Sequence, residues 1–304
     1  MDQQLQVFVT VAEEKNFTRA AKTLHISQPA ISQYIQNLEQ KMDVSLLDRT
    51  NKYVRLNPAG EVFYRYAKEM LGLYEQLGRQ IRDLKEEAAG PLKIGSSFTF
   101  GEYVLPHVVA DFRGRYSRIE PSITIENTQK VVELVECGEL DVGIIEGGIL
   151  GEKHVDVTPF ADDTVVVVAS IDHPLAAQKT VSTADVESEC WIVREQGSGT
   201  REITDNVFQQ FDLRPKTLIE YRSNQVIKES VEAGLGITLL SKWVIRKELM
   251  CKTMKVIPLS YPPIKRKFSL VLRKSKFETK ASSLFRQFLL QQSERLSTID
   301  VTAV

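Results

Sequence analysis

The chain lacks the long apolar runs and the leader that mark membrane-spanning or exported proteins. Its 304 residues contain no uninterrupted apolar run of about 18 residues, the length that a membrane-spanning helix needs. The N-terminal sequence MDQQLQVFVT has no basic segment followed by an apolar stretch, as a secretory signal would. We therefore expect a cytoplasmic protein that does not associate with membranes.

Cysteine and histidine are also scarce. The three cysteines, Cys137, Cys190 and Cys251, are odd in number and far apart, which favours reduced thiols over a disulfide framework or a metal site. The four histidines show no spacing typical of metal ligands. We accordingly expect neither a metal nor a cofactor.

Net charge is nearly absent, but the average conceals a local asymmetry. The formal net charge of −1 does not by itself indicate a nucleic-acid-binding protein. Between Lys15 and Lys68, however, there are nine basic residues and four acidic ones, a local charge of +5. Such a segment attracts a phosphate backbone, although charged runs are often only solvated surface.

Beneath this charge lies the pattern of a helix-turn-helix. Apolar residues recur at helical spacing from Leu5 to Ala12, residues 18–24 predict a second short helix, and residues 28–42 predict a third. Ser27 is the expected N-cap of the third helix, with Pro29 in its first turn. By their spacing, the residues of the third helix that face the core are Ile31, Ile35, Leu38 and Met42.

The other face of the third helix is polar near its start. Glutamine amides and serine hydroxyls can bind base edges in the major groove of DNA. We expect the DNA-reading residues to be Ser27, Gln28, Pro29, Ser32, Gln33 and Gln36. Residues 46–56 then predict two short strands around Asn51, a wing whose Arg49, Lys52 and Arg55 would hold phosphates. A helical hairpin that only packs is the alternative.

A long helix is predicted after the wing. Asn57 can cap it with Pro58 at its first position, and Gly90 followed by Pro91 marks its end. Its apolar residues repeat with heptad spacing over three heptads, which is typical of a helix that pairs with a second helix. The predicted dimerisation residues are Phe63, Ala67, Met70, Tyr74, Leu77, Ile81 and Leu84. The alternative is that this stripe packs on the chain's own core.

Beyond Pro91, short apolar strands alternate with helical patterns. This order predicts parallel sheets covered on both faces, and about 215 residues are more than one doubly wound unit needs. Ligands of such sheets bind outside the carboxyl ends of the strands. Three polar loops follow predicted strands, and their expected effector-binding residues are Ser96, Ser97, Thr99, Thr128, Gly197, Ser198, Gly199, Thr200 and Arg201.

The third of these loops, residues 197–201, is the most informative. Glycines, two hydroxyls and an arginine at a helix start offer free backbone N–H groups to an anion. A glycine turn capped by Ser198 or Thr200 is the alternative. It is not a Walker phosphate loop, because no Gly-Lys-Ser/Thr follows the spacer.

The N-terminal residues resemble the winged helix-turn-helix of LysR-type transcriptional regulators. The resemblance lies in FTRAA at residues 17–21, SQPAIS at 27–32, LLDRT at 46–50 and LNPAG at 56–60. His25 stands where many helix-turn-helix turns carry Gly, and Gln33 where many members carry Arg. GELDVGII at residues 138–145 and AGLGI at 233–237 extend the resemblance over nearly the whole chain.

The resemblance implies an α/β organisation of three parts. Residues 1–57 would be the winged helix-turn-helix, residues 58–90 a linker helix for dimerisation, and residues 91–304 an effector domain of two Rossmann-like lobes, similar to periplasmic binding proteins. Lobe I would comprise residues 91–162 and 267–304, and lobe II residues 163–266, with crossovers near Asp163 and Arg266. The implied partners are double-stranded promoter DNA, a small anionic effector, RNA polymerase, and further copies of the chain in a homodimer or homotetramer.

The run WIVREQGSGTR at residues 191–201 is similar to that of family members governing sulfur assimilation and carbon fixation. It favours control of sulfur and cysteine genes, with carbon-fixation genes and a phosphorylated metabolite as the alternative. A solute-binding protein would explain the two lobes but not the first 90 residues. An enzyme is not expected, because the cleft loops carry no nucleophile with a base and no paired carboxylates.

Overall fold

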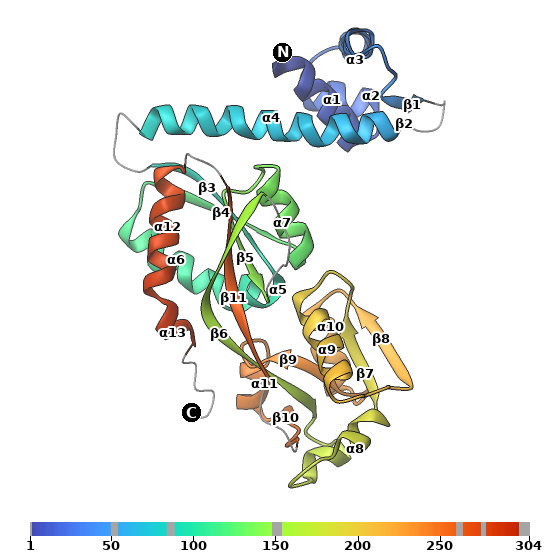
Figure 1. Cartoon of the computed structure of the whole chain (residues 1–304), viewed down its shortest axis with the longest axis vertical. Helices are drawn as coiled ribbons and strands as arrows, with labels where there is room; N and C mark the ends of the chain where they lie inside the picture. Colours follow the sequence, from blue (N-terminus) through green and yellow to red (C-terminus); the bar gives the residue numbers. More distant parts are fainter. Residues whose placement is uncertain are drawn as a thin grey trace. The chain divides into compact units, whose positions relative to one another are not determined.

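The structure is a computed structural model that describes residues 2–49, 54–83, 89–147, 154–259, 264–274 and 278–297 (Figure 1). The chain separates into two compact units, Met1–Lys85 with Glu136–Glu139 and Glu86–Val135 with Leu140–Val304. Among the helices described, none has the length and apolar character to cross a membrane.

The first unit is a three-helix head followed by a wing and a long helix. Its elements are α1 (Asp2–Glu14), α2 (Phe17–Thr23), α3 (Gln28–Met42), β1 (Leu47–Arg49), β2 (Val54–Leu56) and α4 (Pro58–Asp83). β1 and β2 pair antiparallel, as the wing prediction requires, while residues 50–53, where the prediction places the connection, lie outside the described residues.

Helix α3 begins at the predicted residue, and local sequence signals explain why. The Ser27 Oγ accepts a hydrogen bond from the Ala30 N–H at 3.4 Å, and Pro29 lies in the first turn. Ile31, Ile35 and Leu38 are buried in the core of the head. The prediction for Met42 is wrong: its side chain is 45% exposed, because the helix ends there at a left-handed Asp43.

The turn before α3 carries backbone strain. His25 has φ +54°, in the left-handed region that side chains with a Cβ adopt at a cost. This explains why a glycine would suit the position. The turn is held nonetheless by the Ile26 N–H, which donates to the Ala21 carbonyl at 3.0 Å.

The apolar stripe of α4 divides between two roles. The Asn57 Oδ1 caps the helix by accepting the Gly60 N–H at 2.8 Å. Phe63 meets Phe8 edge-on at 4.9 Å and Ala67 is 1% exposed, so both belong to the head's own core. Leu84 lies outside the described residues.

Another part of α4 presents a continuous apolar face to solvent. Its residues are about half exposed and follow helical spacing: Val62, Tyr66, Met70, Leu73, Tyr74, Leu77 and Ile81. The predicted heptad stripe did not include Val62, Tyr66 and Leu73. Because Phe63 and Ala67 of that stripe pack into the core of the head, the face left exposed is displaced around the helix. We call this set the exposed α4 face.

The second unit has two lobes. The elements of the first are β3 (Gly90–Ser96), α5 (Phe98–Tyr103), α6 (Leu105–Arg115), β4 (Ile119–Ile125), α7 (Thr128–Glu136), β5 (Val142–Glu146), α12 (Lys280–Gln291) and α13 (Ser293–Ser297). Those of the second are η1 (Pro174–Ala177), α8 (Thr183–Glu187), β7 (Cys190–Arg194), α9 (Gly199–Gln210), β8 (Thr217–Tyr221), α10 (Asn224–Glu232), β9 (Thr238–Ser241), α11 (Arg246–Cys251) and β10 (Met254–Val256).

Two long strands connect the lobes, β6 (Val155–Ser170) and β11 (Ile264–Arg273). They pair antiparallel, with Asp163 opposite Arg266. Within the lobes the pairs β3–β4, β3–β5 and β7–β8 are parallel, as expected. The whole sheet is nevertheless mixed, in the order β10-β6-β11-β5-β3-β4, because the crossover strands run against their neighbours. The expectation of parallel pairing is therefore confirmed within the lobes, while the crossover strands pair antiparallel.

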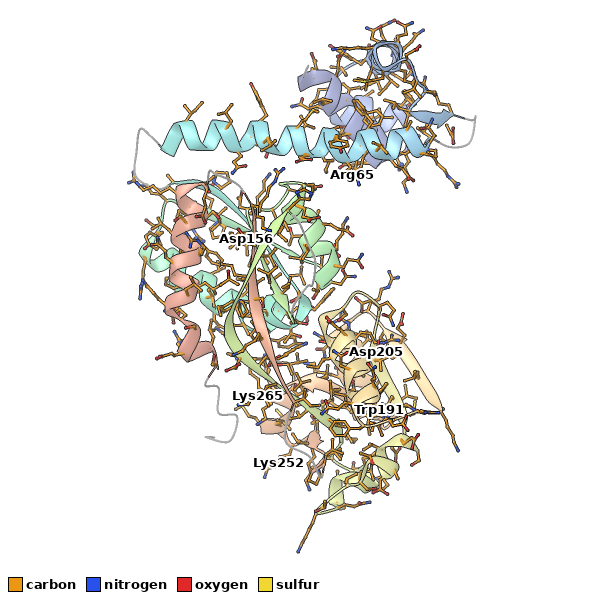
Figure 2. The ribbon with its side chains drawn as sticks, in the orientation of Figure 1. Arg65, Asp156, Trp191, Asp205, Lys252 and Lys265 are labelled. Carbon is orange, nitrogen blue, oxygen red and sulfur yellow. The ribbon has the colours of Figure 1, made fainter. Side chains whose placement is uncertain are left out.

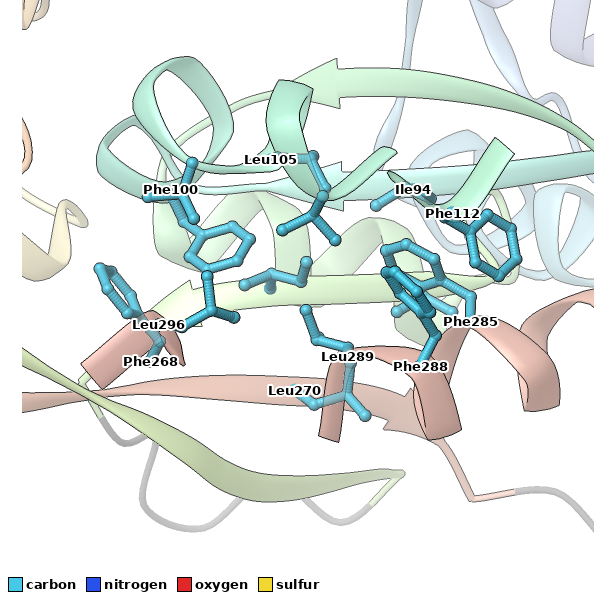
Figure 3. Packing of buried hydrophobic residues seen from close by; sticks show 14 of the residues in the cluster. Ile94, Phe100, Leu105, Phe112, Phe268, Leu270, Phe285, Phe288, Leu289 and Leu296 are labelled. Atoms are coloured by element: carbon cyan, nitrogen blue, oxygen red, sulfur yellow. The ribbon is translucent and has the colours of Figure 1, made fainter. Parts of the chain in front are cut away.

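An aromatic core holds the first lobe together (Figure 3). Phe112 of α6 meets Phe285 and Phe288 of α12 at centroid distances of 5.2 and 5.4 Å. Phe100 of α5 meets Phe268 of β11 at 5.0 Å, so a C-terminal strand completes the core begun near residue 92. On the other face of this sheet, α7 buries its apolar side against Ile145 and Val271.

The core of the second lobe forms on both faces of its sheet. In β6, Val165 and Val167 face one apolar cluster while Val166 and Val168 face the other. Trp191, labelled in Figure 2, is fully buried, and its Nε1–H donates to the Val186 carbonyl at 2.7 Å. A continuous valine run is thus explained by burial on two sides.

We expect His25→Gly to stabilise the head by up to about 1 kcal/mol, because glycine adopts positive φ without the Cβ clash. His25→Val should destabilise it, since a β-branched side chain is least tolerant of that conformation. Urea unfolding of the two variants and wild type measures both changes. A stability order with Val above Gly would contradict this account of the turn.

We also expect the exposed α4 face to pair with a second copy of the chain. Leu77→Glu places a charge in that face and should lower the sedimentation coefficient at micromolar concentration. Leu235→Glu is the matched control, because Leu235 is a similarly half-exposed leucine at 44% outside α4. Unchanged assembly in Leu77→Glu would show that this face does not pair.

Candidate functional site

The predicted DNA-reading residues lie on the surface at the start of α3. Ser27, Gln28, Pro29, Gln33 and Gln36 are exposed, and Ser32 is half-buried. Two local hydrogen bonds orient the amides: Gln28 Nε2 donates to Ser32 Oγ at 2.9 Å, and Gln33 Nε2 to Asn37 Oδ1 at 2.8 Å. The start of α3 therefore presents a polar face suited to base edges.

The wing is fastened to α3 by a residue that the sequence analysis did not single out for a role. The Glu39 Oε1 accepts the N–H groups of Leu46 at 2.8 Å and Leu47 at 3.3 Å, and its carboxylate pairs with Arg49. Arg49 also lies over the Phe17 ring at 5.3 Å. Arg55 is exposed on β2, and Lys52 lies outside the described residues. Arg49 is thus both a phosphate candidate and part of the wing's anchor.

The three predicted effector loops come together in the second unit. Ser96, Ser97 and Thr99 end β3 and begin α5, Thr128 begins α7, and Ser198 and Thr200 begin α9; each is at most 5% exposed. The Gln129 N–H donates to the Gly197 carbonyl at 3.3 Å, which joins the second loop to the third. Loops from both lobes therefore meet in one buried polar junction.

The two glycines of the third loop permit this contact. Gly197 has φ +84°, and a Cβ there would lie 3.1 Å from the Gln129 Oε1. A Cβ at Gly199 would lie 2.6 Å from the Glu146 carbonyl oxygen, a distance that real Cβ atoms do not show. Gly199 thus lets α9 of one lobe rest directly on the end of β5 in the other.

Arg201 does not join this junction. Its guanidinium donates to Asp205 Oδ1 at 2.9 Å, to Glu220 Oε2 at 2.8 Å and to the Arg194 carbonyl at 2.9 Å. Its carboxylate partners both belong to its own lobe, and one of them is only four residues away. The arginine that reaches the junction instead is Arg266 of β11.

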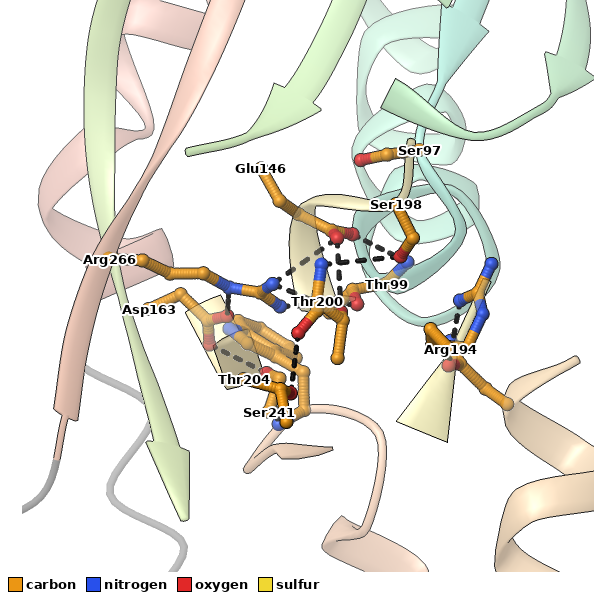
Figure 4. A network of polar contacts seen from close by, with 12 residues as sticks. Ser97, Thr99, Glu146, Asp163, Arg194, Ser198, Thr200, Thr204, Ser241 and Arg266 are labelled. Carbon is orange, nitrogen blue, oxygen red and sulfur yellow. Dashed lines mark hydrogen bonds and ion pairs between the residues drawn. The ribbon is translucent and has the colours of Figure 1, made fainter. Parts of the chain in front are cut away.

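Arg266 is the centre of the buried network (Figure 4). Its Nε donates to Asp163 Oδ2 at 2.7 Å, its Nη2 to Thr99 Oγ1 at 3.2 Å and its Nη1 to Thr200 Oγ1 at 3.1 Å. The same Nη1 lies 3.3 Å from Glu146 Oε2. One guanidinium thus links two carboxylates and a threonine from each lobe, with its side chain 2% exposed.

The two carboxylates are in different electrostatic environments. Burial disfavours an ionised Glu146, but the charge of Arg266 and the hydrogen bond from Thr99 outweigh it and hold the pKa of Glu146 below its ordinary value. At Asp163, burial outweighs Arg266 and the hydrogen bond from Ser241, and the pKa is raised. Glu146 is therefore the carboxylate that stays charged most readily.

A second buried arginine lies beside this network. Arg194 is 1% exposed and binds Glu195 through two hydrogen bonds of 2.8 and 3.1 Å and Asn224 Oδ1 through one of 3.0 Å. Its guanidinium lies 4.4 Å from the centroid of the Phe98 ring in the other lobe. Its charge therefore stays in the lobe junction, balanced by its neighbour in sequence.

Two hydroxyl groups in the junction have no hydrogen-bond partner among the described residues. These are the Ser97 Oγ and the Thr128 Oγ1, both buried. A buried hydroxyl without a partner is costly, so such groups indicate a place where a ligand or water supplies the missing bond. Both stand at helix starts that the sequence analysis assigned to effector binding.

Sequence reasoning missed Glu146, Asp163, Arg194 and Arg266. One signal was available: a charged residue at the end of an otherwise apolar strand, as Glu146 is in β5, needs a partner when it is buried. Asp163 and Arg266 were read only as crossover positions. Their pairing follows from the strand register, which no local pattern reveals.

A winged helix-turn-helix head and a two-lobed domain with a buried polar junction define a class of protein, the DNA-binding regulators that carry a small-molecule-binding domain. Residues 3–61 match the bacterial regulatory helix-turn-helix protein family of lysR type, and residues 85–294 match the LysR substrate binding domain. The chain belongs to the LysR family of transcriptional regulators. The resemblance inferred from sequence is confirmed, and the family's members are not enzymes.

Relatives with assigned names match over almost the whole chain. The chain is 39% identical over 281 residues to the HTH-type transcriptional regulator CysL of Bacillus subtilis, covering 92% of this chain and 94% of CysL. It is 32% identical over 294 residues to a probable RuBisCO transcriptional regulator of Trichormus variabilis, covering 95% and 87%. Both relatives are thus named as transcriptional regulators, and each is matched over most of its length.

Solved structures agree with the fold. A full-length OxyR variant from Pseudomonas aeruginosa superposes with a TM-score of 0.70 at 26% identity, covering 98% of this chain and 95% of OxyR. The regulatory domain of Synechocystis CcmR in complex with 2-PG superposes with a TM-score of 0.62 at 25% identity, covering 69% of this chain and all of that domain. The winged head and the two-lobed α/β domain are therefore shared with known regulators.

We expect Gln28→Ala to weaken binding to the cognate promoter by about 1 to 3 kcal/mol and to relax one base preference, because it removes an amide from the exposed start of α3. Arg49→Ala should weaken binding to all sequences and reduce the slope of affinity against salt by about one phosphate contact. Gln40→Ala, exposed at the far end of α3, is the control. Fluorescence anisotropy on promoter and scrambled duplexes separates the two effects, and an unchanged preference in Gln28→Ala would contradict the assignment.

Proposed function

We propose that this chain regulates sulfur and cysteine metabolism genes in the cytoplasm by binding their promoters through α3 and the wing. A small anionic metabolite bound between the lobes would modulate that binding. The observation that carries the effector site is that buried Thr99 and Thr200, from opposite lobes, both accept hydrogen bonds from Arg266, with Ser97 and Thr128 buried at adjoining helix starts. The regulated genes are proposed from the 39% identity to CysL.

The chemistry of the junction favours an oxyanion over a neutral solute. Its donors are hydroxyls, a backbone N–H and a guanidinium, and charge-assisted hydrogen bonds of this kind are stronger than neutral ones. The CcmR regulatory domain, which has the same fold, was solved with 2-PG, a phosphorylated metabolite. Sulfate, sulfite, thiosulfate and O-acetylserine are the first effectors to test.

Control of carbon-fixation genes by a phosphorylated metabolite is the second candidate. It is favoured by the 32% identity to the RuBisCO regulator and by the 2-PG bound to CcmR. Sulfate and phosphate esters present similar tetrahedral oxygens, so one junction could accept either. A thermal-shift screen that includes sugar phosphates and 2-PG distinguishes the candidates, because a ligand that binds only the native state raises the melting temperature.

Assembly and signalling follow from the same proposal. Two copies paired through the exposed α4 face would place two reading heads on a roughly palindromic site. An effector shifts DNA binding only by the difference between its affinities for two lobe arrangements, and a coupling of about 1 to 3 kcal/mol is typical. A tetramer and a contact with RNA polymerase are further parts of the proposal.

We expect Thr99→Val and Thr200→Val to abolish the effect of the effector on promoter binding without changing binding in its absence. Each removes a hydroxyl from the lobe junction, whereas neither residue belongs to the DNA-reading unit. Thr204→Val is the matched control, because the buried Thr204 Oγ1 donates only to the Thr200 carbonyl, at 2.7 Å, among its described hydrogen bonds. Isothermal titration of the effector into each variant decides the location: wild-type affinity in both junction variants would place the ligand elsewhere.

A further inference from the structure

The anion position of the lobe junction is already filled by a side chain of the protein. The Glu146 Oε1 accepts the Thr99 N–H at 2.7 Å, and its Oε2 lies 3.3 Å from Arg266 Nη1 and 3.4 Å from Thr200 Oγ1. These three donors come from α5, β11 and α9, and they are the groups that an anionic effector would use. Glu146 itself is 1% exposed.

We propose that Glu146 is a built-in competitor for the effector site, and that an anion binds by displacing its carboxylate from Thr99, Thr200 and Arg266. This inference rests on the proposed function, because it assumes that the effector is an anion held at the lobe junction. The inference goes further by naming Glu146 as the residue that determines how tightly this site binds an anion.

The balance of charges around Arg266 favours displacement of the Glu146 carboxylate. Arg266 with ionised Glu146 and Asp163 carries a net charge of −1, and a proton on Asp163 brings it only to zero. Arg194, whose charge also helps to lower the pKa of Glu146, is bound to Glu195 at 2.8 Å, so the pair adds no net charge. Glu102 of α5, which is exposed and has Arg194 and Lys228 as charged neighbours, adds no positive charge itself. A second anion is therefore attracted more strongly once the carboxylate of Glu146 has moved away from Arg266.

The surroundings of Glu146 connect this exchange to the lobe contact. The Cα of Gly199 packs so closely that an added Cβ there would lie 3.0 Å from the Glu146 Cβ and 3.1 Å from the Thr128 Oγ1. A movement of the Glu146 side chain would therefore alter its packing against α9 of the opposite lobe. The Ser97 and Thr128 hydroxyls, which have no hydrogen-bond partner among the described residues, are available to whichever anion occupies the junction.

The test is the affinity of the full-length protein for sulfate, with inorganic phosphate as a second probe. Glu146→Gln keeps the shape and an oxygen acceptor for the Thr99 N–H but removes the charge. We expect its Kd for sulfate to be at least tenfold lower than that of wild type by isothermal titration. Equal or weaker binding in Glu146→Gln overturns the proposal.

Matched variants identify where the gain arises. Glu195→Gln removes another buried carboxylate, 7% exposed, which pairs with Arg194 instead of Arg266, and it should leave the affinity unchanged. A gain equal to that of Glu146→Gln would overturn the competitor role in favour of a general charge effect. Adding Thr200→Val to Glu146→Gln should remove the gain.

Adventitious binding at another basic site is tested separately. A pocket of about 230 Å³ beside Arg246 lies between α6 and α13. Adding Arg246→Ala to Glu146→Gln should not alter the sulfate affinity, and loss of the gain would overturn the proposal. If Glu146→Gln does not fold, Glu146→Asp, which draws the carboxylate back by one methylene, must still tighten sulfate binding.

The outcomes separate this inference from the proposed function. Sulfate that binds wild type and Glu146→Gln equally, and is lost in Thr200→Val, supports the anion site and rejects the competitor. If no variant binds sulfate or phosphate, the competitor role of Glu146 is rejected. If, in addition, none of the tested effectors changes promoter binding, the proposed anion site is rejected as well.

Discussion

The effector domain depends on the hydrogen bonds and ion pairs that the buried guanidinium of Arg266 makes. It stands on one crossover strand opposite Asp163 on the other, and it also reaches Glu146 and a threonine of each lobe. Removing one partner of a buried ion pair typically costs about 3 to 5 kcal/mol, because the remaining charge is left without compensation. The same atoms therefore hold the lobes together and form the polar junction, which ties the domain's stability to its ligand chemistry.

Much of the fold could be predicted because its signals are local. The cap at Ser27 and the long helix after Asn57 follow from side chains that bond to the backbone three residues on, and the wing follows from two short strands close in sequence that pair antiparallel. Two of the effector loops could be predicted to converge because they follow β3 and β4 of one sheet, whereas the third follows β7 of another sheet and was brought to them only by the implied pair of facing lobes. Met42 failed because the end of α3 at a left-handed Asp43 leaves its side chain exposed, which apolar spacing does not reveal.

The charged residues of the junction could not be predicted in the same way. Glu146 and Arg266 are 120 positions apart, and neither is informative without the other. Arg201 seemed the natural anion ligand from its place in a glycine loop, yet Asp205 and Glu220 on its own lobe bind it first. Likewise, the heptad spacing of α4 does not show which apolar residues pack into the core of the head and which remain exposed, because both sets follow the same spacing.

The position of β11 in the sheet also determines the order in which the two units can fold while the chain is being translated. This strand, residues 264–273, lies between β5 and β6, so the sheet of the first lobe stays open until nearly the whole chain has left the ribosome. The winged head needs only contacts among the first part of the chain, and local contacts of that kind form early. A truncated product would thus retain a folded DNA-binding head attached to an incomplete sensor, and could occupy promoters without responding to any metabolite.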